Sequence, residues 1–289
     1  MLQAYLDRIA FRGTPAPTLE VLEHLLACHV FSVPFENLDV QLGRKLSTSP
    51  AEAYDKIVKR RRGGWCYEQN GLFGLVLDEI GFEVTRVAAA VRRAERGEIA
   101  NANHLCLLVK LANDEQTYLV DVGFGGSMTA PIPLQELRCE QTPFQLGLRR
   151  TNDDHWQFWE DVGDGEFSFD FLPTAADEDA LQAKCDFLQT DPSSGFVQSV
   201  VAQIRTPDAH VTLRGKVCSR ATIDGIETHI IESPEELLAT LEKTFGLDVP
   251  EVAALWPRIE ARHEEVMREK AVANTYEMRS LSNAGPGDD

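Results

Sequence analysis

The residues with the clearest chemical potential in this chain are a cysteine, a histidine and an aspartate, in that order. Cys66 stands within the segment RGGWCYEQN, His104 follows 38 positions later, and Asp121 a further 17 later. A thiol alone is a weak nucleophile at neutral pH because little of it is thiolate, but a nearby imidazole can take up its proton. A carboxylate beside the imidazole fixes its tautomer and ring angle. The trio therefore predicts an enzyme with a nucleophilic cysteine.

The sequence after Cys66 predicts a helix that begins at or near this residue. Residues 71–80 carry apolar side chains at helical spacing, and Gly81 can end the helix as a C-terminal cap. Cys66 would then lie in the first turn, where free backbone N–H groups and the helix dipole favour a thiolate. The pair Gly63–Gly64 lets the chain turn sharply into the helix. Amides at the same terminus could stabilise an oxyanion.

His104 and Asp121 are expected to meet through a β-hairpin. Residues 104–110 and 116–122 are apolar runs typical of strands, and residues 112–115 between them read as a turn. If the two strands pair antiparallel about this turn, the start of the first lies beside the end of the second. His104 and Asp121 then become neighbours at the open end of the hairpin.

The remaining cysteines give no sign of a metal site or a disulfide framework. They are expected to be inert packing residues: Cys28, Cys106, Cys139, Cys185 and Cys218. All six cysteines are widely spaced and none forms a CxxC pair, so we expect neither a zinc site nor disulfides. A reducing cytoplasm fits this pattern, and a catalytic thiol requires one.

Several motifs resemble those of the arylamine N-acetyltransferases. The matching segments are 33–38 (VPFENL), 62–70 (RGGWCYEQN), 103–105 (NHL), 120–126 (VDVGFGG) and 185–196 (CDFLQTDPSSGF), so the resemblance spans most of residues 1–250. It implies that Cys66, His104 and Asp121 form a catalytic triad. It also implies acetyl transfer from acetyl-CoA to an aromatic amine or hydrazine, by a ping-pong route through an acetyl-cysteine.

The acceptor pocket is less well defined by the sequence. Trp65 stands where the family more often has Phe or Tyr, and Asn103 precedes the histidine where a small hydroxyl residue is common. Both departures could alter the choice of acceptor. Phe35, Trp65, Tyr67 and Phe124 are candidates for an aromatic acceptor wall, although aromatic side chains are mostly packing elements.

Two other functions fit the same order of residues. An amide synthase of the same fold, which closes a macrolactam from a carrier-bound thioester, would use an unchanged triad. A transglutaminase-like or papain-like thiol hydrolase also arranges Cys, His and Asp in this order. The residues do not separate these alternatives.

The net charge of −18 opposes binding to nucleic acid or to an anionic membrane, and it also opposes binding of the phosphates of CoA. A local site is therefore needed, and the turn Gly123-Phe124-Gly125-Gly126-Ser127 could provide a nest of N–H groups for phosphate. A plain glycine-rich turn is an equally good interpretation. A dinucleotide fingerprint is excluded, because Pro131 and Pro133 follow where a helix would have to begin.

The expected fold class is α+β. Helical signals, such as Thr18 and Ser49-Pro50 as helix starts, dominate the first part, and short strand signals with glycine turns indicate a small barrel or strongly curled sheet in the second. The family resemblance implies a helical bundle with the nucleophile (1–84) and a central β-barrel with a connecting segment (85–194). An α/β lid (195–279) and a disordered tail (280–289) would follow, around a cysteine-protease-like Cys-His-Asp core.

No apolar run approaches the length of a membrane span, and the N-terminus lacks the basic region of a secretion signal. These features favour a cytoplasmic protein whose partners are CoA and a small aromatic amine or hydrazine. The sequence leaves the oligomeric state open.

Overall fold

A computed structural model describes residues 1–112, 115–163 and 165–283, with side chains up to residue 271 in the last helix. Its N-terminal part is helical, as expected. The elements are α1 (Leu2–Arg8), α2 (Leu19–Ser32), α3 (Leu38–Gln41), α4 (Pro50–Tyr54), the π-helical turn η1 (Asp55–Lys59) and α5 (Cys66–Ile80). Thr18 caps α2 by accepting a hydrogen bond from the backbone N–H of Val21, and Gly81 ends α5 in a left-handed conformation at φ 109°. Both helix boundaries confirm the sequence prediction.

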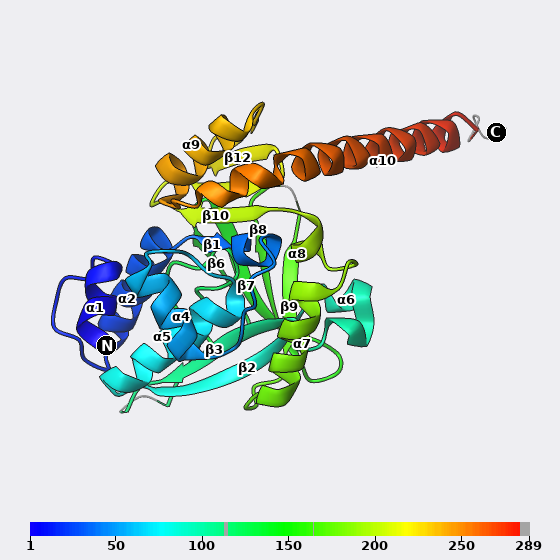
Figure 1. Cartoon of the computed structure of the whole chain (residues 1–289). Coiled ribbons are helices and arrows are strands. Elements are labelled where there is room, and N and C mark those ends of the chain that lie inside the picture. Colours follow the sequence, from blue (N-terminus) through cyan, green and yellow to red (C-terminus); the bar gives the residue numbers. More distant parts are fainter. Residues whose placement is uncertain (113–114, 164, 284–289) are drawn as a thin grey trace, which may run out of the picture.

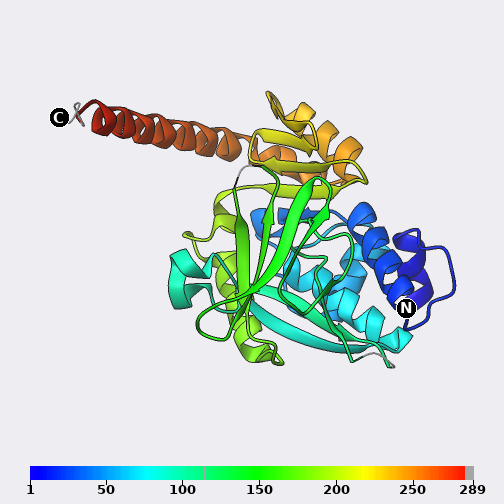
Figure 2. The ribbon, with the colours of Figure 1, turned by 180° about the vertical axis from the view of Figure 1, so that it is seen from behind.

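The central part is one antiparallel sheet of eight strands in the order β5-β4-β3-β2-β9-β8-β7-β6. The strands are β2 (Glu83–Val91), β3 (His104–Lys110), β4 (Thr117–Val120), β5 (Ile132–Pro133), β6 (Leu137–Gln141), β7 (Phe144–Arg150), β8 (Trp156–Asp161) and β9 (Phe167–Phe171). Figures 1 and 2 show it curling around the helical part. Within the described residues no pairing joins the edge strands β5 and β6.

Of the two expectations, a small barrel or a strongly curled sheet, the structure has the second, a curled half-barrel in place of the β-barrel that the family resemblance implied. The short edge strand explains why the sheet stays open. β5 contains only two residues, and Pro133 has no N–H to donate to a further strand.

The C-terminal part contains a smaller antiparallel sheet in the order β1-β10-β11-β12-β13. Its strands are β1 (Phe35–Glu36), β10 (Val201–Arg205), β11 (His210–Arg214), β12 (Val217–Thr222) and β13 (Gly225–Ile230), covered by α9 (Pro234–Phe245) and the 3-10 turn η3 (Pro250–Leu255). Because β1 comes from the N-terminal part, this sheet joins segments far apart in sequence. The Asn37 side chain strengthens the joint with hydrogen bonds to the backbone of Phe196, Ser199 and Val201.

The segments that surround the site connect these layers. They are α6 (Arg93–Arg96), the 3-10 turn η2 (Gly97–Ala100), α7 (Glu178–Thr190) and α8 (Gly195–Gln198). The first residues of the apolar run 196–205 form α8. Ser194 starts this helical turn by accepting a hydrogen bond from the N–H of Phe196, and the strand begins only at Val201.

The last helix, α10 (Trp256–Asn283), begins against the small sheet and then leaves the body of the molecule (Figure 1). Trp256 and Ile259 pack into the core beneath it, whereas Met267 is half exposed. Residues 280–283, the first part of the tail that was predicted to be disordered, belong to this helix. Residues 284–289 lie outside the described part. Within the described ranges, no helix combines the length and the apolar character that a bilayer crossing requires.

Helix α5 lies in the middle of the main core, between the other helices and the large sheet. Leu72, Phe73 and Val76 on this helix are fully buried. Gly74 lets the helix approach the sheet closely, since a Cβ there would lie 3.3 Å from a methyl carbon of Leu107 on β3. The helix that begins with Cys66 is thus fixed by packing on nearly all sides.

Candidate active site

Cys66 is the first residue of α5, and its side chain is almost completely buried, with 3% of its surface exposed. The preceding backbone N–H, that of Trp65, donates a hydrogen bond to Oε2 of Glu68 at 3.2 Å. This is one half of a capping box, in which an acidic residue in the first turn satisfies an otherwise unpaired donor. The predicted position of Cys66 at a helix N-terminus is confirmed.

A buried ionic cluster holds this helix start in place. Nζ of Lys56 lies 2.9 Å from Glu68, 3.2 Å from Asp39 and 3.4 Å from Glu36. Arg62 adds contacts of 2.9 Å to Glu36 and 3.3 Å to Asp39. Burial disfavours a charged Lys56, but the three carboxylates outweigh this and raise its pKa. Arg62, the last of the basic residues before Cys66, is thus buried and paired.

His104 and Asp121 are joined by a hydrogen bond of 2.5 Å from Nε2 to Oδ2. The sheet explains how they meet. Strands β3 and β4 pair antiparallel with Leu107 opposite Val120, so the next residue, Asp121, continues opposite Cys106. Alternate residues of a strand share a face, and His104 therefore lies on the same face as Asp121. The predicted hairpin and the proximity of His104 and Asp121 are confirmed.

His104 is buried, with 2% of its surface exposed. Burial opposes a positive charge, but the charge of Asp121 and hydrogen bonds to Asp121 and Cys66 together raise the pKa of His104 to about 10. The imidazole is thus a cation at neutral pH, with a carboxylate on one side and the thiol on the other. This arrangement suits a thiolate–imidazolium pair.

Asp121 is oriented by Asn70, which lies one helical turn after Cys66 on α5. Nδ2 of Asn70 donates to Oδ1 of Asp121 at 2.7 Å and to the carbonyl of Leu105 at 2.6 Å. Oδ1 of Asn70 accepts from the N–H of Val122 at 3.0 Å. One helix therefore carries the nucleophile and the residue that positions the carboxylate. The family motif includes Asn70, but sequence reasoning assigned it no role, although its spacing of four from Cys66 places both on one helix face.

The turn after Asp121 passes very close to the nucleophile. A Cβ at Gly123 would lie 2.7 Å from Cα of Cys66 and 2.7 Å from Nδ2 of Asn70, so only glycine fits. The N–H of Gly123 donates to Oδ1 of Asp121 at 2.8 Å. The N–H of Gly123 therefore helps to hold the carboxylate of Asp121 in place.

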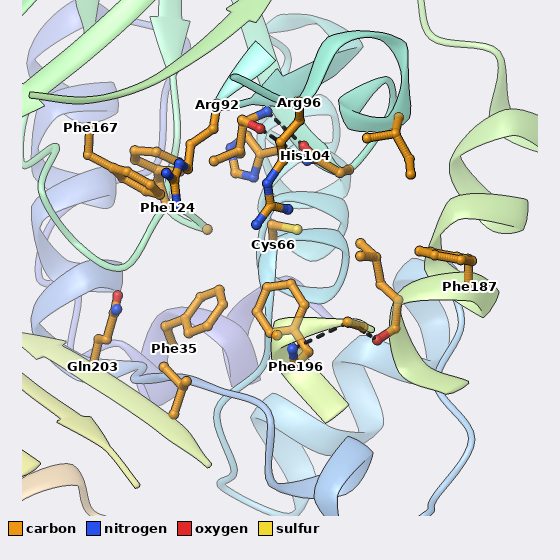
Figure 3. Close-up of a pocket in the computed structure, with 18 of the residues that line it drawn as sticks. Phe35, Cys66, Arg92, Arg96, His104, Phe124, Phe167, Phe187, Phe196 and Gln203 are labelled. Carbon is orange, nitrogen blue, oxygen red and sulfur yellow. Dashed lines mark hydrogen bonds between the residues drawn. The ribbon is translucent and has the colours of Figure 1, made fainter. Parts of the chain in front are cut away.

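A cavity of about 470 Å³ opens beside the triad. Figure 3 shows Cys66 and His104 near its centre, with Phe124 and Phe167 on one side and Phe35 and Phe196 on the other. The ring of Phe124 stacks on Phe167, with centroids 5.1 Å apart. Besides these residues, the lining comprises Val91, Arg92, Arg96, Ile99, Asn103, Gly123, Phe187, Leu188, Ser193, Ser194, Gly195, Val201, Gln203 and Arg214.

Of the four aromatic residues predicted for the acceptor wall, Phe35 and Phe124 line the cavity. Trp65 and Tyr67 do not. Both are fully buried behind it, where the ring of Trp65 packs edge-on against Tyr67 and Phe196, each with centroids 5.4 Å away. Sequence reasoning missed Phe167, Phe187 and Phe196, because the chain brings them to the cavity from distant elements.

The glycine-rich turn predicted to bind phosphate is only partly at the cavity. Gly123 and Phe124 line it, whereas Gly125, Gly126 and Ser127 are absent from the lining. The carbonyl of Gly125 pairs with Nε2 of His210 at 2.7 Å, and Ser127 is buried. Phosphate binding by this turn stays a prediction.

Comparison with known proteins agrees with the geometry. A family model described as N-acetyltransferase matches residues 18–254. An arylamine N-acetyltransferase of Mycolicibacterium smegmatis is 36% identical over 271 residues, which cover 92% of this chain and 98% of that protein. One from Mycobacterium tuberculosis is 34% identical over 265 residues, covering 87% of this chain and 90% of that protein.

Solved structures show the same fold. The arylamine N-acetyltransferase of M. tuberculosis superposes with a TM-score of 0.82 at 34% identity, over 90% of this chain and 99% of that one. The enzyme of Mycobacterium marinum in complex with CoA gives a TM-score of 0.81 at 34% identity, over 91% of this chain and 98% of that one. The chain belongs to the arylamine N-acetyltransferase family and is an enzyme of the acyltransferase class.

Proposed function

We propose that this enzyme transfers an acetyl group from acetyl-CoA to an arylamine or arylhydrazine through an acetyl-Cys66 intermediate. The observation that carries the proposal is the buried chain of contacts from Asp121 through His104 to Cys66, which opens directly onto an aromatic cavity. The M. marinum relative is a CoA complex, which supports CoA as the carrier of the acetyl group.

In the first half-reaction, the Cys66 thiolate attacks the thioester carbonyl. Amide N–H groups in the first turn of α5 are the candidate donors to the oxyanion. When the carbon–sulfur bond to CoA breaks, the imidazolium of His104 gives its proton to the departing CoA thiolate. Acetyl-Cys66, neutral His104 and free CoA remain.

In the second half-reaction, the neutral amine attacks the carbonyl of acetyl-Cys66. An arylamine is weakly basic and keeps its lone pair available at neutral pH. His104 takes the proton that the amine loses, and the bond between the acetyl carbon and Cys66 breaks. The thiolate–imidazolium pair is thereby restored and the amide product leaves.

The apolar lining has a second consequence, because a transferase must protect its thioester from water. With acetyl-CoA alone, release of CoA should therefore stop after about one equivalent per enzyme. Adding an arylamine should restart it, and initial rates should give the parallel lines of a ping-pong mechanism. The measurement is CoA thiol release followed with a chromogenic disulfide.

The other outcomes separate the alternatives. Sustained CoA release without an amine, unchanged by added arylamines, would indicate a thiol hydrolase. A single turnover that no small amine restarts would indicate an amide synthase whose acceptor is part of a larger tethered substrate. Either result would overturn the proposed reaction.

A further inference from the structure

Strand β13 forms an exposed edge of the small sheet. It pairs with β12 on one side, and no strand among the described residues pairs with its other side. Residues 225–229 are all exposed, and Figure 1 shows β12, the neighbouring strand, at the outer end of the molecule beside α9. A row of unpaired N–H and C=O groups on such an edge is a template for pairing with another strand.

The other three edges of the two described sheets carry features that hinder such pairing. β1 and β5 contain two residues each, and Pro133 of β5 has no N–H to donate. β6 presents the exposed charged side chains of Arg138 and Glu140, which protect an edge. β13 has six residues and contains no proline, lysine or arginine. It is therefore the edge that is most open to a further strand.

The hydrogen bonds between β12 and β13 show which backbone groups of β13 point outwards. The N–H of Ile231 donates to the carbonyl of Lys216 at 2.8 Å, so these two residues form a hydrogen-bonded pair that continues the register of the strands. Hydrogen-bonded and non-hydrogen-bonded pairs alternate along an antiparallel ladder. Counted back from Ile231, the odd-numbered residues of β13 bond to β12. The N–H and C=O groups of the even-numbered residues, Ile226, Thr228 and Ile230, therefore point outwards.

The outward edge of β13 is complementary to a second copy of itself. When two such strands meet antiparallel about a twofold axis at Thr228, this residue lies opposite its own copy and Ile226 lies opposite Ile230. These are the residues whose backbone groups point outwards, so each outward N–H meets a carbonyl of the other copy. Between them Glu227 lies opposite His229, so a carboxylate meets an imidazole.

The side chains also select this register over its neighbours. An axis at Glu227 would set two copies of the same carboxylate against each other, and like charges directly opposite destabilise a strand pair. An axis at His229 would likewise set two imidazoles together and would leave fewer residues of the strand paired. The axis at Thr228 avoids both, and it places Ile226, which is 44% exposed in the single chain, beside Ile230 of the other copy.

We propose that the enzyme forms a twofold-symmetric dimer in which β13 pairs with β13 of a second copy. The two five-stranded sheets then join into one continuous sheet across the axis. The contact is small, so dimer and monomer should exchange as the protein concentration changes. No residue of β13 lines the cavity, and the inference is therefore independent of the acetyl-transfer chemistry.

The first test measures the dissociation constant of the dimer by sedimentation equilibrium. Salt at about 0.15 M screens the repulsion between two chains that each carry a net charge of −18. Thr228→Pro removes the outward N–H at the axis and leaves the bonds to β12 in place. The dissociation constant should rise about 30-fold, the loss expected for two symmetry-related hydrogen bonds. Far-UV circular dichroism equal to the parent's would show that the variant is folded.

A second variant keeps the test decisive if the proline disturbs folding. Thr228→Lys sets two ammonium groups against each other at the axis and should also weaken the dimer. Thr174→Lys is the matched control, since it makes the same substitution at an exposed position outside both sheets, and its dissociation constant should equal the parent's. A parent that stays monomeric up to millimolar concentration would overturn the inference, and so would a dimer that Thr228→Lys leaves unchanged.

The register is tested by disulfide trapping. In Thr228→Cys the two new cysteines form a pair at the axis, with Cα atoms about 5.5 Å apart, which is within the range of a disulfide. In Ile226→Cys they lie four residues out of register, roughly 14 Å apart. Mild oxidation should therefore give a linked dimer of Thr228→Cys on non-reducing electrophoresis, while Ile226→Cys should behave as the parent. Equal cross-linking of the two variants would contradict the proposed pairing, whatever the acetyl-transfer experiments show.

Discussion

The proposed chemistry of the site depends on a histidine that is held between two partners. Asp121 and Cys66 both contact His104, and together they outweigh burial and raise its pKa to about 10. In the proposed mechanism, the proton on His104 is the one that passes to the departing CoA thiolate.

Removing the imidazole should strongly slow the reaction of Cys66 with alkylating reagents in mild acid. In the parent, Cys66 should react readily with iodoacetamide at pH 6, where an unassisted thiol is almost entirely protonated. His104→Ala should slow this alkylation strongly, as measured by the mass of the intact protein over time. Equal alkylation rates at pH 6 in the parent and in His104→Ala would disprove the ion pair.

Substitutions of Asn70 and of Asp121 should slow the acetylation of Cys66 by different amounts. Asp121→Asn keeps the shape but favours the wrong imidazole tautomer, and the acetylation rate of Cys66 could fall by roughly 10⁴-fold, as in serine triads. Asn70→Ala removes one hydrogen bond to the carboxylate, and a bond to a charged group corresponds to roughly 10- to 100-fold in rate. Single-turnover acetylation measures both. A rate in Asn70→Ala equal to the parent's would remove Asn70 from the positioning of Asp121.

The positions of Cys66, His104 and Asp121 were predicted well, because each of the three follows a local signal. Cys66 begins a helix with a glycine end, and His104 and Asp121 flank a hairpin. The role of Asn70 was not predictable in this way. It depends on which distant residue the fold brings near, namely Asp121.

Helix α5 is the element on which the site is built. It contributes Cys66, Glu68 and Asn70, and the buried cluster around Lys56 fixes its first turn. Burying this many charges is costly unless every group is paired, and removing one partner leaves the others uncompensated. The stability of the helix start and the geometry of the site are therefore linked.

Lys56→Met should test this link. Three carboxylates would lose their shared cation, and the free energy of unfolding should fall by about 3–5 kcal/mol in urea titrations. Lys59→Met is the matched control in the same helical turn, where Lys59 forms an exposed pair with Asp55 at 3.3 Å. That loss should be about 0–1 kcal/mol. Equal losses in both variants would show that the buried cluster has no special role.

His29 on α2 links α1 to the loop that precedes Cys66. It bonds Tyr5 at 2.6 Å and Gln69 at 3.0 Å, and Gln69 donates to the carbonyl of Gly64 at 2.7 Å. Burial lowers the pKa of His29 to about 3 although the hydrogen bond to Gln69 opposes this. His29 is therefore neutral in the folded protein at neutral and mildly acidic pH.

This depressed pKa predicts a loss of stability in acid. The unfolded chain binds a proton at His29 below about pH 6.5, whereas the folded protein does not until about pH 3. The contribution of His29 to the free energy of unfolding is therefore complete above pH 6.5 and is lost as the pH falls towards 3. Between pH 6 and 4, His29→Gln should reduce the slope of unfolding free energy against pH by about 1.4 kcal/mol per pH unit. Identical slopes in urea titrations of the parent and the variant would contradict the neutral buried histidine.

Local patterns predicted the elements better than their arrangement. The capped helices α2 and α5 and the β3–β4 hairpin follow from sequence, because caps, glycine ends and turns act over a few residues. The open edge of the large sheet did not follow, since it depends on how β5 and β6 are placed.

In the molecule as a whole, the site lies where the three parts meet. Cys66 comes from the helical part, His104 and Asp121 from the large sheet, and Val201, Gln203 and Arg214 complete the cavity from the small sheet. Strand β1 of the helical part pairs with β10 and ties the third part to the first. The assembly thus brings the buried thiol of Cys66 to the meeting point of the three parts, where the proposed covalent step would take place.

The most direct test of this central claim is the mass of the intact protein after incubation with acetyl-CoA and no amine. We predict the addition of one acetyl group, located on Cys66 by peptide mapping, and its loss when an arylamine is added. The Cys66→Ala variant should stay unmodified under the same conditions. Acetylation of Cys66→Ala at the parent's rate would contradict the account.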